Sequence, residues 1–353
     1  MKYGRHQIDK AGEIIMSAKI AEDYDDAMNK INEWRTLHLP ALDALQNELI
    51  PFLKTHNIDI FLTSRRLKRI TSILYKLDIN PEMRLGGMQD IGGLRIVVND
   101  MSALLSTKEI LSQYAPKDFQ LIKIMDYIQN PKASGYRSIH FIYKYKNVEN
   151  PDADGAKIEL QVRTKLQHSW AMAVETAGLI TSTPLKSSLG SDEWLEFFKI
   201  VSSLFAIKEQ QPILKKHSDN GYDMYMLMKM LYDINCIHKH SDTLKALSVT
   251  GVHAKKEKFR NGYYLLNINF DTKIVNIRAY PKEKENEATV EYAELEKATK
   301  DGTNAVVLVS VPKMKELQDA YPSYFLNTSE FLEAIDKMNY NYEIYKKYKE
   351  DTL

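Results

Sequence analysis

The chain is almost without cysteine, since Cys236 is the single one among 353 residues. One cysteine cannot form an intrachain disulfide, and a zinc site built from thiolates needs several of them. The composition therefore excludes a disulfide-stabilised fold, argues against a cysteine-based zinc site and indicates a reducing compartment, the cytoplasm.

Long apolar runs and a net charge are missing as well. No stretch approaches the roughly 18 apolar residues that a membrane span needs, and residues 1–10 lack the apolar core of a signal peptide. Lys and Arg number 48 against 47 Asp and Glu. This balance gives no overall basic field of the kind that marks a nucleic-acid binder. We therefore expect a soluble cytoplasmic protein with no membrane partner.

The length allows two domains, each with its own core. Residues 13–53 have apolar positions at helical spacing with a break at Pro40, and a further helix is expected over 64–77. Strands are predicted where apolar and polar residues alternate: 94–98, 121–127, 138–145 and 157–163. A helix over 102–114 separates the first two, and helices return after Thr164 as far as about His240. This pattern predicts an α/β (α+β) fold, in which an αβα unit precedes a smaller α+β unit.

The composition changes near Ser248. Short strands are predicted over 262–270, 273–280, 288–292 and 304–311, followed by a terminal helix over about 329–349. We therefore predict a first domain over residues 1–245 and a small α+β domain over 246–353.

The strand 157–163 carries a row of polar side chains. Glu159, Gln161 and Arg163 alternate with three aliphatic residues, so they share one face of the sheet. A carboxylate, an amide and a guanidinium in a row suit a site for a metal ion and a phosphate. The alternative is the solvent-facing side of an edge strand.

Asp90 precedes Gly92, Gly93 and a second buried strand. An aspartate at a strand end is a common oxygen ligand of Mg²⁺, and with Glu159 it gives the two carboxylates that a Mg²⁺-dependent phosphoryl or pyrophosphoryl transfer needs. Arg95 interrupts the apolar strand, so it is expected to face a cavity where it can stack on a purine. The alternative is a structural turn followed by a surface arginine.

Two further segments carry cations. On the helix expected over 64–77, basic and hydroxyl side chains could clamp a polyphosphate: Arg66, Lys68, Arg69, Ser72 and Lys76. The alternative there is a solvated basic face. In the loop and strand over 130–140, Lys132 and Arg137 offer phosphate-binding charge, and Tyr136 offers a ring on which a base can stack. His140 is expected on the same side of the strand, with a purely structural role as the alternative.

These motifs resemble, in order and spacing, the RelA/SpoT alarmone synthetase domain over about residues 58–176. The resemblance rests on four motifs: Arg66-x-Lys68-x-x-x-Ser72-Ile73-x-x-Lys76, Asp90-Ile91-x-Gly93-x-Arg95, Pro131-Lys132-x-x-Gly135-Tyr136-Arg137-Ser138-Ile139-His140 and Glu159-x-Gln161-x-Arg163-Thr164. It implies a nucleotidyltransferase-like mixed sheet with flanking helices, in an enzyme that moves the β,γ-pyrophosphate of ATP onto a ribose 3′-hydroxyl.

The resemblance also implies a role for each residue. Asp90 and Glu159 would be catalytic and bind Mg²⁺, with Glu159 as the base. The ATP-binding residues would be Arg66 and Arg95, on either side of the adenine, with Lys68, Arg69, Ser72 and Lys76. The acceptor-binding residues would be Lys132, Tyr136, Arg137, His140, Gln161 and Arg163.

The added residues after the synthetase region resemble those of CapRel-type fused toxin–antitoxin proteins. In that group the carboxy-terminal domain has a pseudo-zinc-finger fold, restrains the toxin and responds to a phage structural protein such as a capsid subunit. The resemblance implies that Tyr342 and Tyr345, on the terminal helix, take the place of adenine between Arg66 and Arg95.

Three functions stay open from the sequence. The first is a toxin that pyrophosphorylates the 3′-CCA end of tRNA and is held in check by its own tail. The second is a (p)ppGpp synthetase that uses GDP or GTP as acceptor. The third is a catalytically silent regulator that binds a nucleotide or RNA.

Overall fold

The computed structural model describes residues 2–17, 21–180, 185, 190–245, 251–254, 262–269, 272, 274–298, 304–311, 316–321, 325 and 328–350. The strands are β1 (Ile60–Leu67), β2 (Gly92–Val98), β3 (Phe119–Asp126), β4 (Ile139–Tyr145), β5 (Lys157–Thr164), β6 (Gly251–Ala254), β7 (Tyr263–Asn269), β8 (Ile274–Tyr280) and β9 (Asn304–Ser310). The helices are α1 (Arg5–Ser17), α2 (Ala21–Thr36), α3 (Leu39–Thr55), α4 (Ile70–Asp78), α5 (Met101–Gln113), α6 (Lys165–Ile180), α7 (Asp192–Lys208), α8 (Lys215–Asp219), α9 (Met224–His238), α10 (His240–Lys245), α11 (Glu285–Ala298), α12 (Leu317–Ala320) and α13 (Ser329–Glu350).

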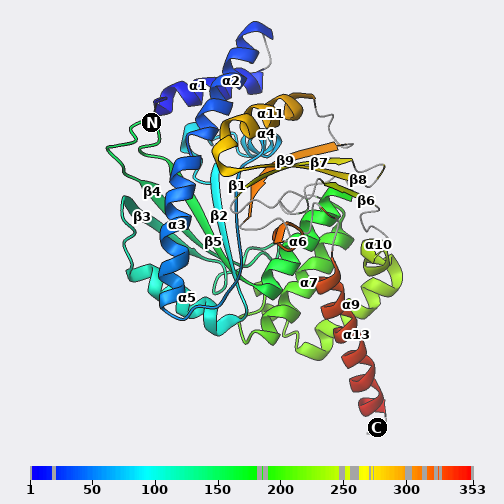
Figure 1. Ribbon diagram of the computed structural model, residues 1–353. Coiled ribbons are helices and arrows are strands. Elements are labelled where there is room, and N and C mark those ends of the chain that lie inside the picture. The colour runs from blue at the N-terminus through cyan, green and yellow to red at the C-terminus, as the bar shows by residue number, and fades with distance from the viewer. Residues whose placement is uncertain are drawn as a thin grey trace.

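The described strands form one mixed sheet with helices on both faces (Figure 1). The strand order is β3-β4-β5-β2-β1-β9-β7-β8-β6. The pairs β2–β5 and β6–β8 are parallel, and the other pairs are antiparallel. The predicted α+β class with a mixed sheet is therefore confirmed.

The alternation in β5 separates a core face from a polar face. Ile158, Leu160 and Val162 are fully buried in the core that the sheet shares with α3 and α5. Their polar neighbours face the opposite side, towards a cavity near α6. Since β5 lies between β4 and β2, it is an interior strand, and the alternative of a solvent-facing edge strand is excluded.

The helix expected over 64–77 is shorter than predicted. Residues Ile60–Leu67 form β1, which pairs with β2 over most of its length, and α4 begins only at Ile70. The sequence around Ser64 to Arg66 shows no clear alternation of apolar and polar residues, because buried polar side chains occupy positions where a strand usually has aliphatic ones. Pairing with β2, rather than the local preference of these residues, determines their strand conformation. The break at Pro40 is confirmed, because this residue opens the first turn of α3.

The carboxy-terminal strands continue the sheet of the first part of the chain. β9 pairs with β1 through Arg65–Ser310 and Arg66–Val309, and β7, β8 and β6 follow. The strand expected over 288–292 is wrong: these residues lie in α11, where Ala288 and Tyr292, four apart, are buried against the sheet. The predicted boundary at 245/246 borders residues 246–250, which are outside the described residues.

A second layer of helices covers the other side of the molecule. α6, α7 and α9 form an apolar cluster that includes the buried side of the terminal helix α13, and the end of α13 extends beyond the body (Figure 1). Among the described residues, no helix has the length and apolar character needed to cross a bilayer.

Candidate functional site

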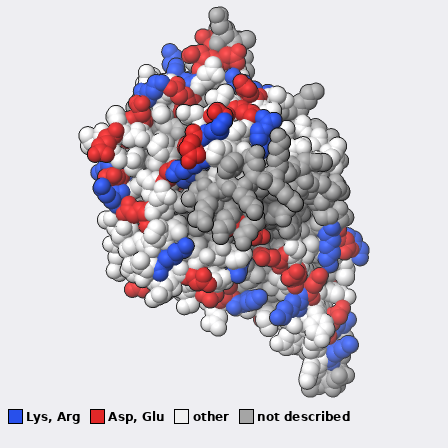
Figure 2. Space-filling model, in the orientation of Figure 1, with Lys and Arg blue, Asp and Glu red and all other residues white. Residues whose placement is uncertain are grey.

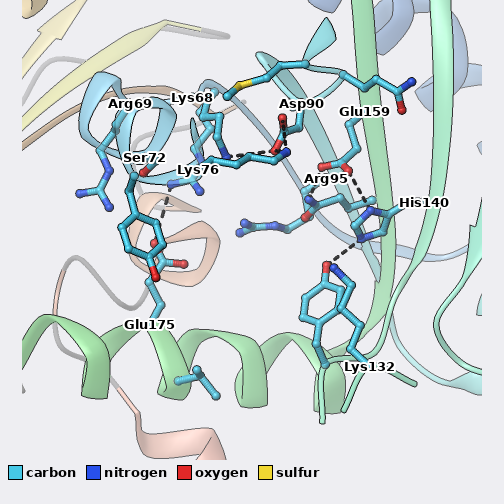
Figure 3. A pocket seen from close by; sticks show the side chains of 18 of the residues that line it. Lys68, Arg69, Ser72, Lys76, Asp90, Arg95, Lys132, His140, Glu159 and Glu175 are labelled. Carbon is cyan, nitrogen blue, oxygen red and sulfur yellow. Dashed lines mark hydrogen bonds and ion pairs between the residues drawn. The ribbon is translucent and has the colours of Figure 1, made fainter. Parts of the chain in front are cut away.

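A cavity of about 1000 Å³ opens between the polar face of the sheet, α4 and α6 (Figure 3). This volume lies at the upper end of the range of about 300–1,000 Å³ for small-molecule sites, which is room for a donor and an acceptor. The cavity brings together most of the residues that the sequence singled out: Arg66, Lys68, Arg69, Ser72, Lys76, Asp90, Arg95, Lys132, Tyr136, His140, Glu159, Gln161 and Arg163.

Asp90 lies between two ammonium groups. Lys68 Nζ is 3.0 Å from Asp90 Oδ2, and Lys76 Nζ is 3.0 Å from both carboxylate oxygens. Burial alone would raise the pKa of Asp90, but the two lysines lower it to about 2. Burial also lowers the pKa of Lys68. The three side chains form a compact charged group beside α4. Such a group suits a polyphosphate with its metal ion.

Arg95 and Arg66 line the cavity from neighbouring strands. Arg66 Nη1 is 3.8 Å from Glu175 Oε1 on α6. Arg95 Nη1 donates to the carbonyl oxygen of Ala320 at 3.2 Å, and its guanidinium carbon is 5.9 Å from the ring centroid of Tyr321. Burial lowers the pKa of Arg95 to about 10. The carboxy-terminal segment therefore contacts the arginine that was expected to stack on adenine.

The carboxylate of Glu159 is held by a ring of hydrogen bonds, of which Figure 3 shows the one with His140. Its Oε1 lies 2.8 Å from His140 Nδ1, and its Oε2 accepts from Gln161 Nε2 at 2.6 Å. Tyr136 Oη closes the ring, lying 2.7 Å from His140 Nε2 and accepting from Arg163 Nη2. Arg163 Nη2 also donates to Gln161 Oε1 at 2.7 Å. The polar row predicted on β5 is therefore one connected network with the loop and β4.

This network sets the charge of Glu159. Burial alone would raise the pKa of its carboxyl, but the hydrogen bond with His140 holds that pKa below its usual value. The negative charge of Asp90 acts in the opposite direction, which indicates that the two carboxylates are neighbours. The pKa of His140 is raised despite burial, because the Tyr136 hydroxyl and Glu159 favour its charged form. The carboxyl of Glu159 is thus kept ionised, with both oxygens held in place.

Aromatic rings and cations meet at the loop after β3. Lys132 Nζ lies 5.2 Å from the ring centroid of Tyr136 and 4.6 Å from that of Tyr127, and the Arg163 guanidinium lies 5.0 Å from Tyr136. Tyr127 was missed from the sequence, although an aromatic residue directly after a strand that precedes this loop was a usable signal. A planar base entering here would meet two rings and two positive charges.

Arg137 does not face the cavity, so its predicted contact with an acceptor phosphate is wrong. It is buried on the other side of the loop, where Nε donates to Ser202 Oγ at 3.2 Å and Nη1 to the carbonyl oxygen of Ile128 at 3.3 Å. Burial lowers its pKa to about 10. Neighbours on an extended segment point to opposite sides, so Tyr136 and Arg137 could not both line the site.

Tyr342 and Tyr345 are also absent from the cavity lining. Tyr342 is buried in the apolar cluster, with its ring centroid 5.6 Å from that of Tyr225 and 5.2 Å from that of Tyr232 on α9. Tyr345 is 47% exposed. The expectation that they lie between Arg66 and Arg95 is therefore wrong for this structure. The apolar side of α13, which includes Phe331, Ile335 and Tyr342, is a packing face, and the ring found beside Arg95 is that of Tyr321.

The donor set fits a magnesium ion held jointly with a substrate. Mg²⁺ is usually bound through one or two carboxylates together with substrate phosphates and water, and Asp90 and Glu159 are such a pair. In the described part of the chain, no group of three or more His, Cys, Asp and Glu residues is arranged to hold a metal without a substrate. Buried guanidinium nitrogens of Arg95 (Nε) and Arg163 (Nε and Nη1) have no hydrogen-bond partner among the described residues.

Part of the chain is similar to known proteins. Residues 65–178 match the family described as "Region found in RelA / SpoT proteins". GTP pyrophosphokinase YwaC of Bacillus subtilis (strain 168) is 29% identical over 160 residues, which are 42% of this chain and 75% of YwaC. GTP pyrophosphokinase YjbM of the same organism is 36% identical over 113 residues, 31% of this chain and 52% of YjbM. The solved structure of small alarmone synthetase 2 from Bacillus subtilis aligns with 50% of this chain and 92% of its own, at 25% identity and a TM-score of 0.42.

The sheet, the paired carboxylates and the cations define an enzyme that transfers a phosphate-containing group. Residues 65–178 match the RelA/SpoT region, and the enzyme is a pyrophosphokinase. The match lies within the stretch over which the sequence resembled that family, apart from two residues at its end. The finer likeness to CapRel-type proteins stays a prediction.

Proposed function

We propose that this protein transfers the β,γ-pyrophosphoryl group of ATP to the 3′-hydroxyl of a ribose. The observation that carries the proposal is that Asp90 and Glu159 line one cavity together with a cluster of cations. In the reaction the acceptor oxygen bonds to the β-phosphorus, the bond from that phosphorus to the α,β-bridging oxygen breaks, and AMP leaves. Glu159 takes the proton of the hydroxyl.

Each group then has a defined task. Lys68 and Lys76 already hold Asp90, and they neutralise the donor phosphates that approach it. Bound Mg²⁺ would supply further positive charge at the transferred group, with Asp90 and Glu159 as its ligands. His140 and Gln161 each hold one oxygen of Glu159, which fixes the orientation of the carboxylate and leaves a second lone pair on each oxygen for the proton of the hydroxyl. Arg66 and Arg95 would hold the adenine.

The acceptor best supported is a guanosine nucleotide, GDP or GTP. The named relatives are GTP pyrophosphokinases, and Tyr136, Tyr127 and Lys132 offer rings and a cation to a purine base at the far end of the cavity. A silent regulator, the third alternative, is opposed by the same relatives and by the paired carboxylates.

A tail-restrained toxin that modifies the 3′ end of tRNA is the second candidate, and one observation favours it. Ala320 and Tyr321, from the carboxy-terminal part, contact Arg95 where an adenine was expected. A restraint by the tail would therefore act through this segment. On the face drawn in Figure 2, Lys and Arg are interspersed with Asp and Glu, rather than gathered as a stripe for a nucleic-acid backbone. Release by a phage structural protein stays a prediction from the resemblance.

A competition assay tests the proposal. The full chain is incubated with Mg²⁺, γ-labelled ATP and equal concentrations of GDP, GTP and deacylated tRNA, and the label is followed by chromatography and gel electrophoresis. Label in a guanosine nucleotide supports the first candidate, and label in tRNA the second. Label that stays in ATP with every acceptor, both in the wild type and in Tyr321→Ala, which removes the ring beside Arg95, would refute pyrophosphoryl transfer by this chain.

A further inference from the structure

The helix that carries Ser72 and Lys76 begins without a cap of its own. Arg69, at the N-cap position of α4, makes no side-chain capping hydrogen bond. The first backbone N–H groups of any helix lack partners within the helix and need another acceptor. For α4 that acceptor comes from far along the chain: the amide of Ile70 donates to Glu296 Oε1, on α11, at 3.0 Å.

Glu296 is itself fixed by two partners. Tyr292 Oη donates to the same Oε1 at 2.8 Å, and Arg35 Nη1 donates to Oε2 at 3.1 Å. Arg35 also donates to Tyr292 Oη at 2.9 Å, which closes a triangle between α2 and α11. The side chains of Arg35 and Glu296 are 2% and 10% exposed. A carboxylate enclosed in this way is held in one position. Its negative charge also interacts favourably with the positive end of the α4 dipole.

The capped residue, Ile70, lies within two helical turns of Ser72 and Lys76, which line the part of the cavity assigned to ATP. α4 is only nine residues long, so a loosened first turn would affect Ser72 directly and Lys76 through the helix axis. Lys76 contacts both oxygens of Asp90. We propose that Glu296 is a positioning residue that holds α4, and with it the phosphate-binding side chains, in the geometry that ATP requires. The proposal rests on the proposed function for its kinetic part.

Three variants distinguish the effect of losing the cap from a general loss of stability. Glu296→Ala removes the acceptor, Glu296→Gln keeps an oxygen for the Ile70 amide but loses the charge, and Glu294→Ala removes an exposed carboxylate from the same helix as a control. Hydrogen exchange of peptides covering residues 69–75 reports on the first turn of α4 without any need for activity. Steady-state kinetics give KM for ATP and kcat separately.

We expect Glu296→Ala to speed exchange in this peptide about tenfold and to raise KM for ATP about fivefold, with kcat within about twofold of wild type. Glu296→Gln should stay within about twofold of wild type in both, and Glu294→Ala should match wild type. If Glu296→Ala lowers only the melting temperature, or if Glu296→Gln is as damaging as Glu296→Ala, capping by Glu296 is refuted. Absence of transfer in the wild type would refute the proposed function instead, and the exchange rates would then decide the role of Glu296.

Discussion

The substitution Glu159→Gln should reduce catalysis strongly while leaving the structure of the site nearly unchanged. The carboxylate accepts hydrogen bonds on both oxygens, from His140 at 2.8 Å and from Gln161 at 2.6 Å. A glutamine keeps the shape but turns one acceptor into a donor. The imidazole can adapt by accepting at Nδ1 and donating from Nε2 to the hydroxyl of Tyr136. The change should therefore cost about 1 kcal/mol in the free energy of unfolding, and the protein should remain folded.

The effect on catalysis should be much larger. General-base catalysis contributes about 10²–10⁴-fold, and the variant loses a metal ligand as well. We expect kcat/KM to fall at least 10²-fold, equivalent to about 2.7 kcal/mol of transition-state stabilisation. The assay follows label from γ-labelled ATP into the acceptor, alongside thermal denaturation of both proteins.

Two further variants complete the test. Glu149→Gln removes an exposed carboxylate from the loop between β4 and β5 and should leave activity unchanged. Asp90→Asn should abolish transfer too, but with a greater loss of stability, because Lys68 and Lys76 are left close together without their carboxylate. Retention by Glu159→Gln of more than about a tenth of wild-type kcat/KM, a loss under about 1.4 kcal/mol, would show that Glu159 is not the base.

Three other outcomes follow from the geometry. Tyr136→Phe should lower kcat/KM for the acceptor about tenfold, because the hydroxyl holds His140; unchanged kinetics would mean that only the ring matters. Gly135→Ala should lower the free energy of unfolding by about 2–4 kcal/mol in urea titrations, since φ is +95° and a Cβ would lie 2.9 Å from Ser202 Cβ; a loss below about 1 kcal/mol would contradict this. Burial lowers the pKa of His38 to about 4, from 6.5, so its contribution to stability is present above pH 6.5 and is lost as the pH falls to 4. His38→Gln should therefore lose about 3 kcal/mol less than wild type between pH 7 and pH 4, and equal losses would refute the assignment.

The alternation of apolar and polar residues along strands accounts for most of what could be predicted from the sequence. In β5 the alternation placed Glu159, Gln161 and Arg163 on one face, and the structure joins them in one network. The same pattern failed at β1, because buried Arg65 and Ser64 interrupt the apolar face. Their burial depends on partners distant in sequence, such as Tyr263, whose hydroxyl accepts from Arg65, and no local pattern reveals such partners.

The contacts between the two halves of the chain were beyond the reach of sequence patterns. The resemblance placed Tyr342 at the adenine site, but the surface that a helix packs on cannot be read from the sequence of that helix alone, and Tyr342 packs on α9. Tyr321 gave no signal, since a single tyrosine beside a four-residue helix belongs to no periodic pattern. Its position beside Arg95 depends on how β9 joins β1.

The most direct test of the central claim is the identity and amount of the nucleoside product. Transfer of a pyrophosphoryl group releases AMP, whereas transfer of a single phosphoryl group releases ADP. With Mg²⁺, γ-labelled ATP and the acceptor that takes the label, the account predicts equal molar amounts of AMP and labelled acceptor, both absent with Glu159→Gln. ADP as the main product, or AMP formed without any labelled acceptor, would contradict it.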